Sequence, residues 1–265
     1  MVSIDGIEAF WDRVRSSRRR SLALDYDGTL APFRVDRMAA VPLAEVIPLL
    51  GKIRDETETR LALVSGRPLS ELLQLVGDLR IAMIGSHGFE RREPDGTLQV
   101  ATLREEQSQR LSMAEQEVQR RGLASRWERK VASVAVHTRG LPTDEAAALE
   151  RDLSATWRAD ADEWGMECRA FNGGIELRAL GADKGTALTS WLDHLDQLDG
   201  GVASGEHLAV YVGDDDTDED AFRALQDRGG LGIKVGPSAA RTAARGRLAD
   251  CEAVRDFLAS WLEAR

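Results

Sequence analysis

Two runs of acidic residues stand out because each directly follows a short apolar stretch. Residues 25–30 read DYDGTL after apolar residues 22–24, and residues 213–220 read GDDDTDED after apolar residues 208–212. Carboxylates held close together without compensation repel one another and raise each other's pKa values. A hard divalent cation relieves this repulsion, and magnesium suits a site with few carboxylates, several waters and a ligand phosphate. The two runs therefore indicate a cation site, provided that the fold brings them together.

Short apolar runs predict the strands that position these acids. Stretches this short, apolar on both faces, are typical of buried strands in a parallel sheet. They lie at 22–24, 61–64, 81–84, 208–212 and 231–235. Segments with helical periodicity alternate with them, at 43–57, 69–76, 184–195 and 217–225. This alternation favours an open α/β sheet, and Pro48 is expected to kink the first of these helices or delay its start.

The residues that follow the predicted strands at their carboxyl ends form the candidate site. Ligands of open α/β sheets collect at these ends. The segments that follow the second and third strands are Ser65-Gly66-Arg67 and residues 85–90, which read GSHGFE. We expect both to lie near the two acidic runs. A calcium loop fits poorly, because the second acidic run lacks the glycine at its sixth position and the Glu at its twelfth.

The middle of the chain predicts a separate, smaller module. Its expected elements are a polar helix at 103–122, a strand at 130–138, a helix at 143–159, and a hairpin of 166–171 with 175–179 around Asn172-Gly173-Gly174. Asn and Gly tolerate the positive φ that tight hairpin turns require. We therefore expect an α/β core at 1–103 and 180–265, interrupted by an α+β module at 104–179.

Four segments, taken in order, resemble the motifs of the haloacid dehalogenase superfamily. They are DYDGTL, Ser65-Gly66-Arg67, the lysine of Ala182-Asp183-Lys184-Gly185, and GDDDTDED. In detail the chain is similar to trehalose-6-phosphate phosphatases. The resemblance implies a Rossmann-like core with an inserted cap. It also implies magnesium-dependent hydrolysis of trehalose 6-phosphate to trehalose and phosphate through an aspartyl phosphate, as the last step of trehalose biosynthesis.

The resemblance assigns this chemistry to residues of the motifs. Asp25 is implied as the nucleophile, and Asp27 as the general acid for the leaving sugar oxygen and then the base for the hydrolytic water. Lys184 is implied to neutralise developing charge. The implied magnesium ligands are Asp25, the backbone carbonyl of Asp27 and Asp214, with Asp218 supporting them through water or through Lys184. The implied phosphate-binding residues are Thr29, Ser65, Gly66 and Lys184.

The inserted module resembles the part of the family that selects the sugar. The implied substrate-binding residues are Arg67, His87, Glu90, Glu128, Lys130, His137, Arg139 and Glu176. Lys130, Ser133 and His137 occupy offset positions of the predicted strand, so they can share a face only with a bulge. The chain departs from the family at Thr138, where a Tyr is usual, in the hairpin turn, where a Lys is common, and at Ala179, where a Pro is usual.

Composition excludes several classes of protein. The 265-residue chain has a formal charge of −10, which disfavours nucleic acid as a partner. Its two cysteines, Cys168 and Cys251, have neither metal-type nor disulfide-framework spacing. No apolar run approaches the roughly 20 residues of a membrane helix. The N-terminal basic cluster follows the apolar residues, the wrong order for a signal peptide. We expect a cytoplasmic monomer that stands alone and pairs functionally with a separate trehalose-6-phosphate synthase.

Three other functions remain as alternatives. A related capped phosphatase acting on sucrose 6-phosphate or mannosyl-3-phosphoglycerate would share every catalytic residue. A catalytically silent regulator that binds sugar phosphate would be expected to lack Asp25, Asp27 or Asp214, and all three are present. A phosphoacceptor receiver domain is about half this length, and the second Asp of DYD is out of place in one. Only the first alternative is separated from the main hypothesis by residues outside the motifs.

Overall fold

The computed structural model describes residues 3–4, 6–123, 125–198, 200, 207–237 and 241–264. The chain divides into two compact units. The first unit combines Met1–Gln99 with Asp183–Arg265, and the second is Val100–Ala182. The segment 104–179, expected as the inserted module, lies inside the second unit's bounds.

The first unit is built on a mostly parallel sheet, which confirms the α/β class. Its strand order is β1-β13-β12-β11-β2-β3-β4-β5-β6. The strands from β13 to β4 in that order are parallel, whereas β1 and β5 pair antiparallel with their neighbours. The bounds are β1 Ser3–Ile4, β2 Arg19–Leu24, β3 Thr59–Val64, β4 Ala82–Gly85, β5 Glu90–Arg92, β6 Leu98–Val100, β11 His207–Gly213, β12 Leu231–Val235 and β13 Gly246–Leu248. All five strands predicted from apolar runs are present.

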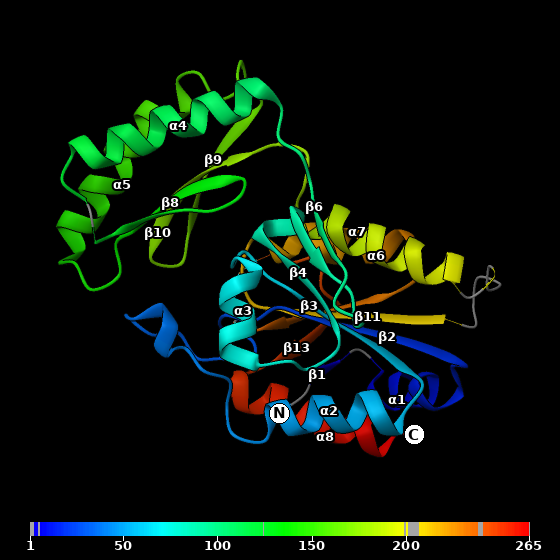
Figure 1. Ribbon diagram of the computed structural model, residues 1–265. Helices are drawn as coiled ribbons and strands as arrows, with labels where there is room; N and C mark the ends of the chain where they lie inside the picture. The colour runs from blue at the N-terminus through cyan, green and yellow to red at the C-terminus, as the bar shows by residue number, and fades with distance from the viewer. Residues whose placement is uncertain are drawn as a thin grey trace. The chain divides into compact units, whose positions relative to one another are not determined.

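Helices cover both faces of this sheet (Figure 1). Those packed in one apolar cluster are α1 Ile7–Ser16, α2 Val46–Glu56, α3 Leu69–Val76 and α8 Cys251–Glu263. Those packed in the cluster on the other face are α6 Lys184–Leu198 and α7 Asp218–Asp227. Because α2 begins at Val46, Pro48 lies in its first turn, where backbone N–H groups need no partner within the helix. The proline therefore delays the helix and does not break it.

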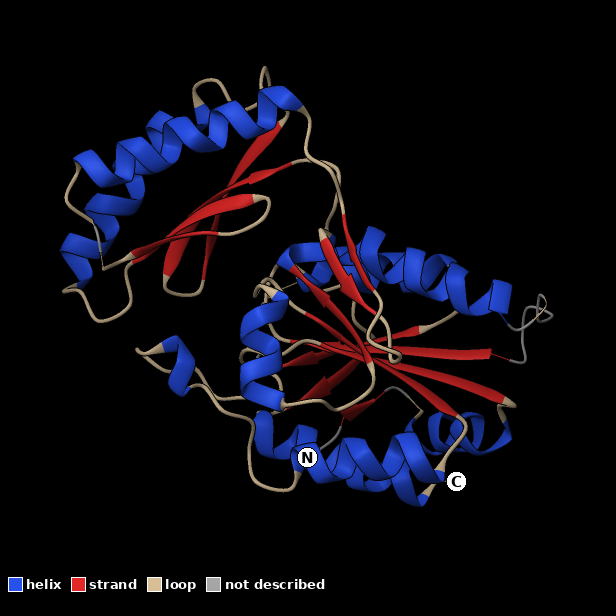
Figure 2. Cartoon of the chain, in the orientation of Figure 1, coloured by secondary structure: helices blue, strands red, loops and turns tan. Residues whose placement is uncertain are grey.

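The second unit is an antiparallel sheet with two helices, α4 Glu105–Arg120 and α5 Thr143–Arg158 (Figure 2). Its strand order is β7-β8-β10-β9. The bounds are β7 Trp127–Arg129, β8 Ser133–His137, β9 Met166–Phe171 and β10 Gly174–Ala179. The predicted hairpin is present: β9 and β10 are joined at Gly173, which has φ 93°.

The predicted strand at 130–138 is wrong in its first part. Two strands, β7 and β8, pair antiparallel there, and Lys130 lies in the turn between them. The turn is closed by a hydrogen bond from the N–H of Lys130 to the carbonyl of Ser133, at 2.9 Å. Because Lys130 lies outside both strands, the alternation of side chains along a strand does not fix its direction. The bulge expected from its spacing to His137 is therefore not needed.

Among the described residues, none of the helices combines the length and apolarity that a membrane crossing requires.

Candidate active site

The two acidic runs meet at one edge of the first unit's sheet. Strands β2 and β11 are parallel neighbours, with Leu24 opposite Val212, so both chains leave the sheet at the same edge. The backbone N–H of Asp25 still donates to the carbonyl of Val212, at 2.9 Å. Carboxylate oxygens of Asp25, Asp214 and Asp218 all lie within 4.8 Å of one another. The acids therefore form one cluster, as the strand ends predicted.

Lys184 joins two of these acids. Its Nζ donates to Oδ1 of Asp25 and to Oδ1 of Asp218, each at 2.7 Å. The hydroxyl of Tyr211 donates to the same Asp218 oxygen at 2.6 Å, and the N–H of Asp215 donates to Oδ2 at 2.8 Å. Because both oxygens of Asp218 are engaged, that residue orients Lys184, and Lys184 in turn orients Asp25.

Burial sets the electrostatics of the cluster. Desolvation raises the pKa of Asp25 to about 7, with Lys184 opposing the rise and Asp218 adding to it. Desolvation, with the charges of Asp25 and Asp218, raises the pKa of Asp214 to about 9. Burial alone would lower the pKa of Lys184, but the carboxylates of Asp218 and Asp25 outweigh it and raise that pKa. The lysine therefore stays charged among three acids, and the cluster holds more carboxylates than it can neutralise.

The residues present fit a hard divalent cation. Oδ1 of Asp214 is buried and has no hydrogen-bond partner within the described part of the chain. An acceptor left this way is costly unless a cation or donor arrives. The other oxygen of Asp214, Oδ2, packs against the backbone at Gly28, which has φ 74°. A side chain at this position would collide with it, because an added Cβ would lie 2.1 Å from Oδ2. The oxygen-only donor set is the one that Mg²⁺ prefers.

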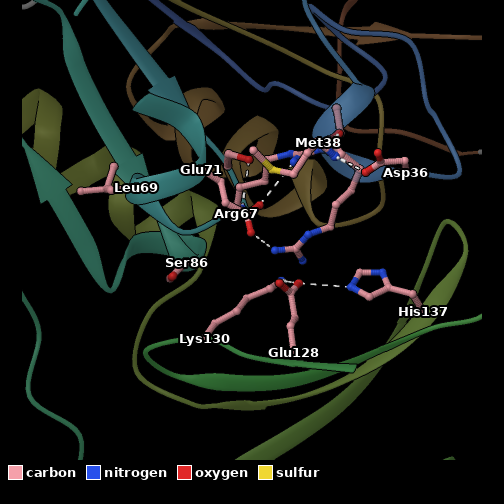
Figure 3. Close-up of polar contacts among 12 residues, drawn as sticks. Asp36, Met38, Arg67, Leu69, Glu71, Ser86, Glu128, Lys130 and His137 are labelled. Atoms are coloured by element: carbon pink, nitrogen blue, oxygen red, sulfur yellow. Dashed lines mark hydrogen bonds and ion pairs between the residues drawn. The ribbon is translucent and has the colours of Figure 1, made fainter. Parts of the chain in front are cut away.

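The side chain of Asp27 is held by Arg67 and is not one of the three clustered acids. Both of its oxygens accept from Arg67: Nε to Oδ2 at 2.6 Å and Nη2 to Oδ1 at 2.7 Å. Arg67 also donates to the carbonyl of Arg37 at 2.8 Å and lies 3.3 Å from Oε2 of Glu71. Figure 3 shows Arg67 beside Glu71, which lies four residues further along the chain, in α3. The contacts of Arg67 within the first unit thus favour a role in holding Asp27.

Two hydroxyls predicted to bind phosphate are buried near the strand ends. Ser65 is buried after β3, and its Oγ accepts from the N–H of Arg67 at 3.1 Å. Thr29 is fully buried, and its hydroxyl has no hydrogen-bond partner among the residues that the structure describes. Gly66 matters because a Cβ there would lie 2.6 Å from the imidazole of His87. The imidazole is therefore packed directly against this loop.

The loop after β4 braces the loop after β3. Ser86 and His87 have φ 48° and 56°, in the left-handed region that L-residues seldom adopt. Oε2 of Glu90 accepts from the Ser86 hydroxyl at 2.5 Å and from the N–H of Leu69 at 3.3 Å. The structure thus places His87 and Glu90, both predicted to bind substrate, against the loop that carries Ser65. Strain held at such loops is found at functional sites.

A second polar cluster lies wholly within the second unit. Oε1 of Glu176 accepts from Nζ of Lys130 at 2.9 Å and from Oγ of Ser133 at 2.6 Å. Lys130 is also 3.6 Å from Oε1 of Glu128, which lies 3.2 Å from Nε2 of His137 (Figure 3). Lys130 therefore links two carboxylates, so all the predicted sugar-binding residues of this unit except Arg139 come together as one group.

Two further residues of that unit lie elsewhere. Arg139 donates to the carbonyl of Asn172 in the β9–β10 turn. Thr138, which replaces the family's usual Tyr, donates to Oε1 of Glu150 at 2.5 Å. Both side chains support the fold of the unit.

Tyr211, Glu71 and Arg37 also contact the site residues, although the sequence motifs do not include them. Tyr211 had a signal, since a hydroxyl-bearing ring inside an apolar strand next to an acidic run needs a partner. Glu71 also had one, because it follows Arg67 at a spacing of four. Arg37 had none: it begins a single helical turn, Arg37–Ala39, that is distant from Arg67 in the sequence, where its carbonyl accepts from Arg67 and its guanidinium group pairs with Glu71.

The chain is similar to known proteins over most of its length. The model of the family described as trehalose-phosphatase matches residues 23–251. The chain is 32% identical over 251 residues to a probable trehalose-phosphate phosphatase of Sinorhizobium fredii, covering 91% of this chain and 86% of that protein. It is 27% identical over 239 residues to a Dictyostelium discoideum protein named alpha,alpha-trehalose-phosphate synthase, covering 89% of this chain but 29% of that protein. The C-terminal domain of the Candida albicans trehalose-6-phosphate phosphatase has a similar fold, with TM-score 0.86, 20% identity and coverage of 99% and 98%.

Proposed function

Because the chain belongs to the trehalose-phosphatase family of the haloacid dehalogenase superfamily, we propose that it hydrolyses trehalose 6-phosphate through an aspartyl phosphate, with magnesium bound. The observation that carries this proposal is the convergence of Asp25, Asp214 and Asp218 around Lys184 at the carboxyl edge of the sheet. Phosphoryl transfer requires a positioned nucleophile and charge neutralisation, and this cluster supplies both.

In the first step an oxygen of Asp25 attacks phosphorus while the bond to the sugar oxygen breaks. The Nζ of Lys184 donates to Oδ1 of Asp25 at 2.7 Å, which orients the nucleophilic carboxylate. The same ammonium balances negative charge on the phosphoryl group. Asp27 gives a proton to the departing sugar oxygen. The products are the free sugar and Asp25 as an acyl phosphate.

In the second step water attacks the phosphorus of the aspartyl phosphate. Asp27 takes a proton from that water, the acyl–phosphate bond breaks, and Asp25 returns as a carboxylate with inorganic phosphate released. The buried hydroxyls of Ser65 and Thr29 are proposed to donate to phosphoryl oxygens in both steps, with the backbone at Gly66 beside them.

Asp25, the carbonyl of Asp27 and Asp214 would hold the magnesium ion. When bound, this ion supplies Lewis-acid polarisation of a phosphoryl oxygen and neutralises the excess of carboxylates. Asp218 supports the arrangement through Lys184, to which it is bonded at 2.7 Å.

We propose that the second unit recognises the sugar. Glu128, Lys130, His137 and Glu176 offer carboxylates, an ammonium and an imidazole in one connected group, which suits hydroxyls that act as both donors and acceptors. The substrate would come from a separate trehalose-6-phosphate synthase, so that the reaction completes trehalose biosynthesis.

A phosphate-release screen tests this function. Trehalose 6-phosphate, sucrose 6-phosphate, glucose 6-phosphate and mannosyl-3-phosphoglycerate are each supplied with Mg²⁺ or with excess chelator. We expect the highest kcat/KM with trehalose 6-phosphate and no turnover in chelator. A preference for sucrose 6-phosphate or mannosyl-3-phosphoglycerate would instead support a related capped phosphatase, and turnover in chelator would contradict the metal site.

A further inference from the structure

One lysine lies inside a strand next to the acidic edge of the sheet. Lys234 is the fourth residue of β12, and its side chain is only 13% exposed. The chain has four lysines in all, and strand β12 is otherwise apolar or Gly. An ammonium this buried requires partners that compensate for its desolvation.

The partners of Lys234 belong to the acidic run. Its Nζ donates to the backbone carbonyl of Asp215 at 2.8 Å and lies 3.8 Å from Oε1 of Glu219. On the other side of the same residue, the N–H of Asp215 donates to Oδ2 of Asp218 at 2.8 Å. An ammonium and a carboxylate thus fix the backbone on both sides of Asp215.

Glu219 is itself fixed, so Lys234 has a rigid counter-ion. Oε1 of Glu219 accepts from the hydroxyl of Thr242 at 2.6 Å, and Oε2 accepts from the N–H of Ala243 at 2.8 Å. Lys234 also lies over the ring of Phe222, with Nζ 5.9 Å from the ring centroid. These contacts hold the ammonium against the turn after β11.

The hydrogen bonds to the backbone of Asp215 bear on Asp214, which directly precedes it. Oδ1 of Asp214 has no hydrogen-bond partner among the described residues, so no side-chain bond to that oxygen sets its direction. Its other oxygen packs against the backbone at Gly28, and the backbone of the turn that carries Asp214 sets where the carboxylate starts. We propose that Lys234 is a positioning residue for the cation site: it fixes the turn at Asp215 and thereby aims Asp214. This inference rests on the cation site proposed above.

The direction in which metal affinity changes when Lys234 is replaced distinguishes a positioning role from a purely electrostatic one. A cation close to a metal site repels the metal, so loss of the charge of Lys234 alone would strengthen metal binding. Loss of an outer group that orients a ligand weakens metal binding, typically about 10- to 100-fold. The two explanations predict opposite changes in the same measurement.

The test is an equilibrium titration with Mn²⁺, followed by the electron paramagnetic resonance signal of the free ion. It uses the intact chain with Lys234→Met, Lys234→Arg and the control Lys52→Met, which removes an exposed ammonium from α2. We expect Lys234→Met to raise the Kd for Mn²⁺ by about tenfold or more. Lys234→Arg, which keeps charge and donors, should stay within about threefold of the unmodified protein, and Lys52→Met should be unchanged.

Unchanged or tighter Mn²⁺ binding by folded Lys234→Met would overturn the inference, even if its thermal stability fell. Failure of the unmodified protein to bind Mn²⁺ would instead overturn the cation site itself. If Lys234→Met does not fold, Lys234→Thr provides the test, because its short β-branched side chain suits a strand but removes both the ammonium and its hydrogen bond to the Asp215 carbonyl. That variant must also bind Mn²⁺ more weakly than the unmodified protein, or the inference fails.

Discussion

The contacts of Asp27 in this structure conflict with the role proposed for it. The proposed chemistry needs one of its oxygens at the leaving group, whereas both oxygens are bonded to Arg67. One of the two hydrogen bonds from Arg67 must therefore break during the reaction. The guanidinium group already contacts Oε2 of Glu71 at 3.3 Å, and this contact can keep it in place. This arrangement favours Arg67 as a positioning residue, although its sequence context predicts substrate binding.

Substitution of Arg67 distinguishes the two roles. We expect Arg67→Met to lower kcat about 10- to 100-fold for both trehalose 6-phosphate and p-nitrophenyl phosphate, because Asp27 loses its orientation in either reaction. The KM for the sugar phosphate should change little. A rise in KM confined to the sugar phosphate would show that Arg67 binds substrate, and exposed Arg223→Met on α7 serves as the control.

The assignment of Asp25 is tested by its closest isostere. Asp25→Asn should lower kcat by at least about 1,000-fold, because an amide is a poor nucleophile toward phosphorus. Circular dichroism should show a native fold, since size and packing are kept. Asp216→Asn, an exposed change in the second acidic run, should leave kcat nearly unaltered. Turnover of Asp25→Asn close to that of the unmodified chain would remove the nucleophile from the mechanism.

At the scale of elements, the turn after β2 depends on Gly28. Gly28→Ala combines a left-handed backbone with a Cβ that would meet Oδ2 of Asp214 at 2.1 Å. We expect a loss of about 1–3 kcal/mol in the free energy of unfolding and weaker Mg²⁺ binding, as measured by urea unfolding with and without Mg²⁺. Gly77→Ala is the matched control, because Gly77 has φ 69° with open space around it. Equal losses of metal binding in both variants would rule out the collision with Asp214.

The β7–β8 hairpin and β10 together carry the sugar-recognition hypothesis. Glu176→Gln removes the charge that Lys130 and Ser133 share, so we expect KM for trehalose 6-phosphate to rise about tenfold. KM for p-nitrophenyl phosphate, which lacks the sugar, should not change. The exposed helix substitution Glu145→Gln is the control. A parallel rise for both substrates would move sugar recognition away from this cluster.

At the scale of the whole molecule, the excess of buried carboxylates couples metal binding to folding. Magnesium should raise the free energy of unfolding by about 2.7 kcal/mol at 100 times its Kd. Asp214→Asn should abolish that gain. At neutral pH the metal-free variant should also be more stable than the metal-free parent, because burial raises the pKa of Asp214 to about 9 and the free energy of keeping this carboxyl protonated is no longer needed. Urea unfolding of both proteins in Mg²⁺ and in chelator measures this. An undiminished Mg²⁺ gain in Asp214→Asn would place the cation elsewhere.

Most of the core and the meeting of the two acidic runs could be predicted from the sequence. Asp25 and Asp214 follow apolar runs, and parallel strands end at a common edge, so their convergence required only the strand assignment. The second unit was harder. The reversal at Lys130 separates two short strands that read as one, because neither β7 nor the turn contains the glycine or proline that usually marks a hairpin.

The sequence by itself determined which residue types reach the acidic edge, because a strand's direction and length follow from local apolar patterning. Only the tertiary structure decided which partners those residues take. Arg67 meets Asp27 across 40 positions of the chain, and Lys234 meets Asp215 across 19. Such pairings depend on strand order and on the reach of long side chains across neighbouring loops, and no local pattern in the sequence encodes either of these.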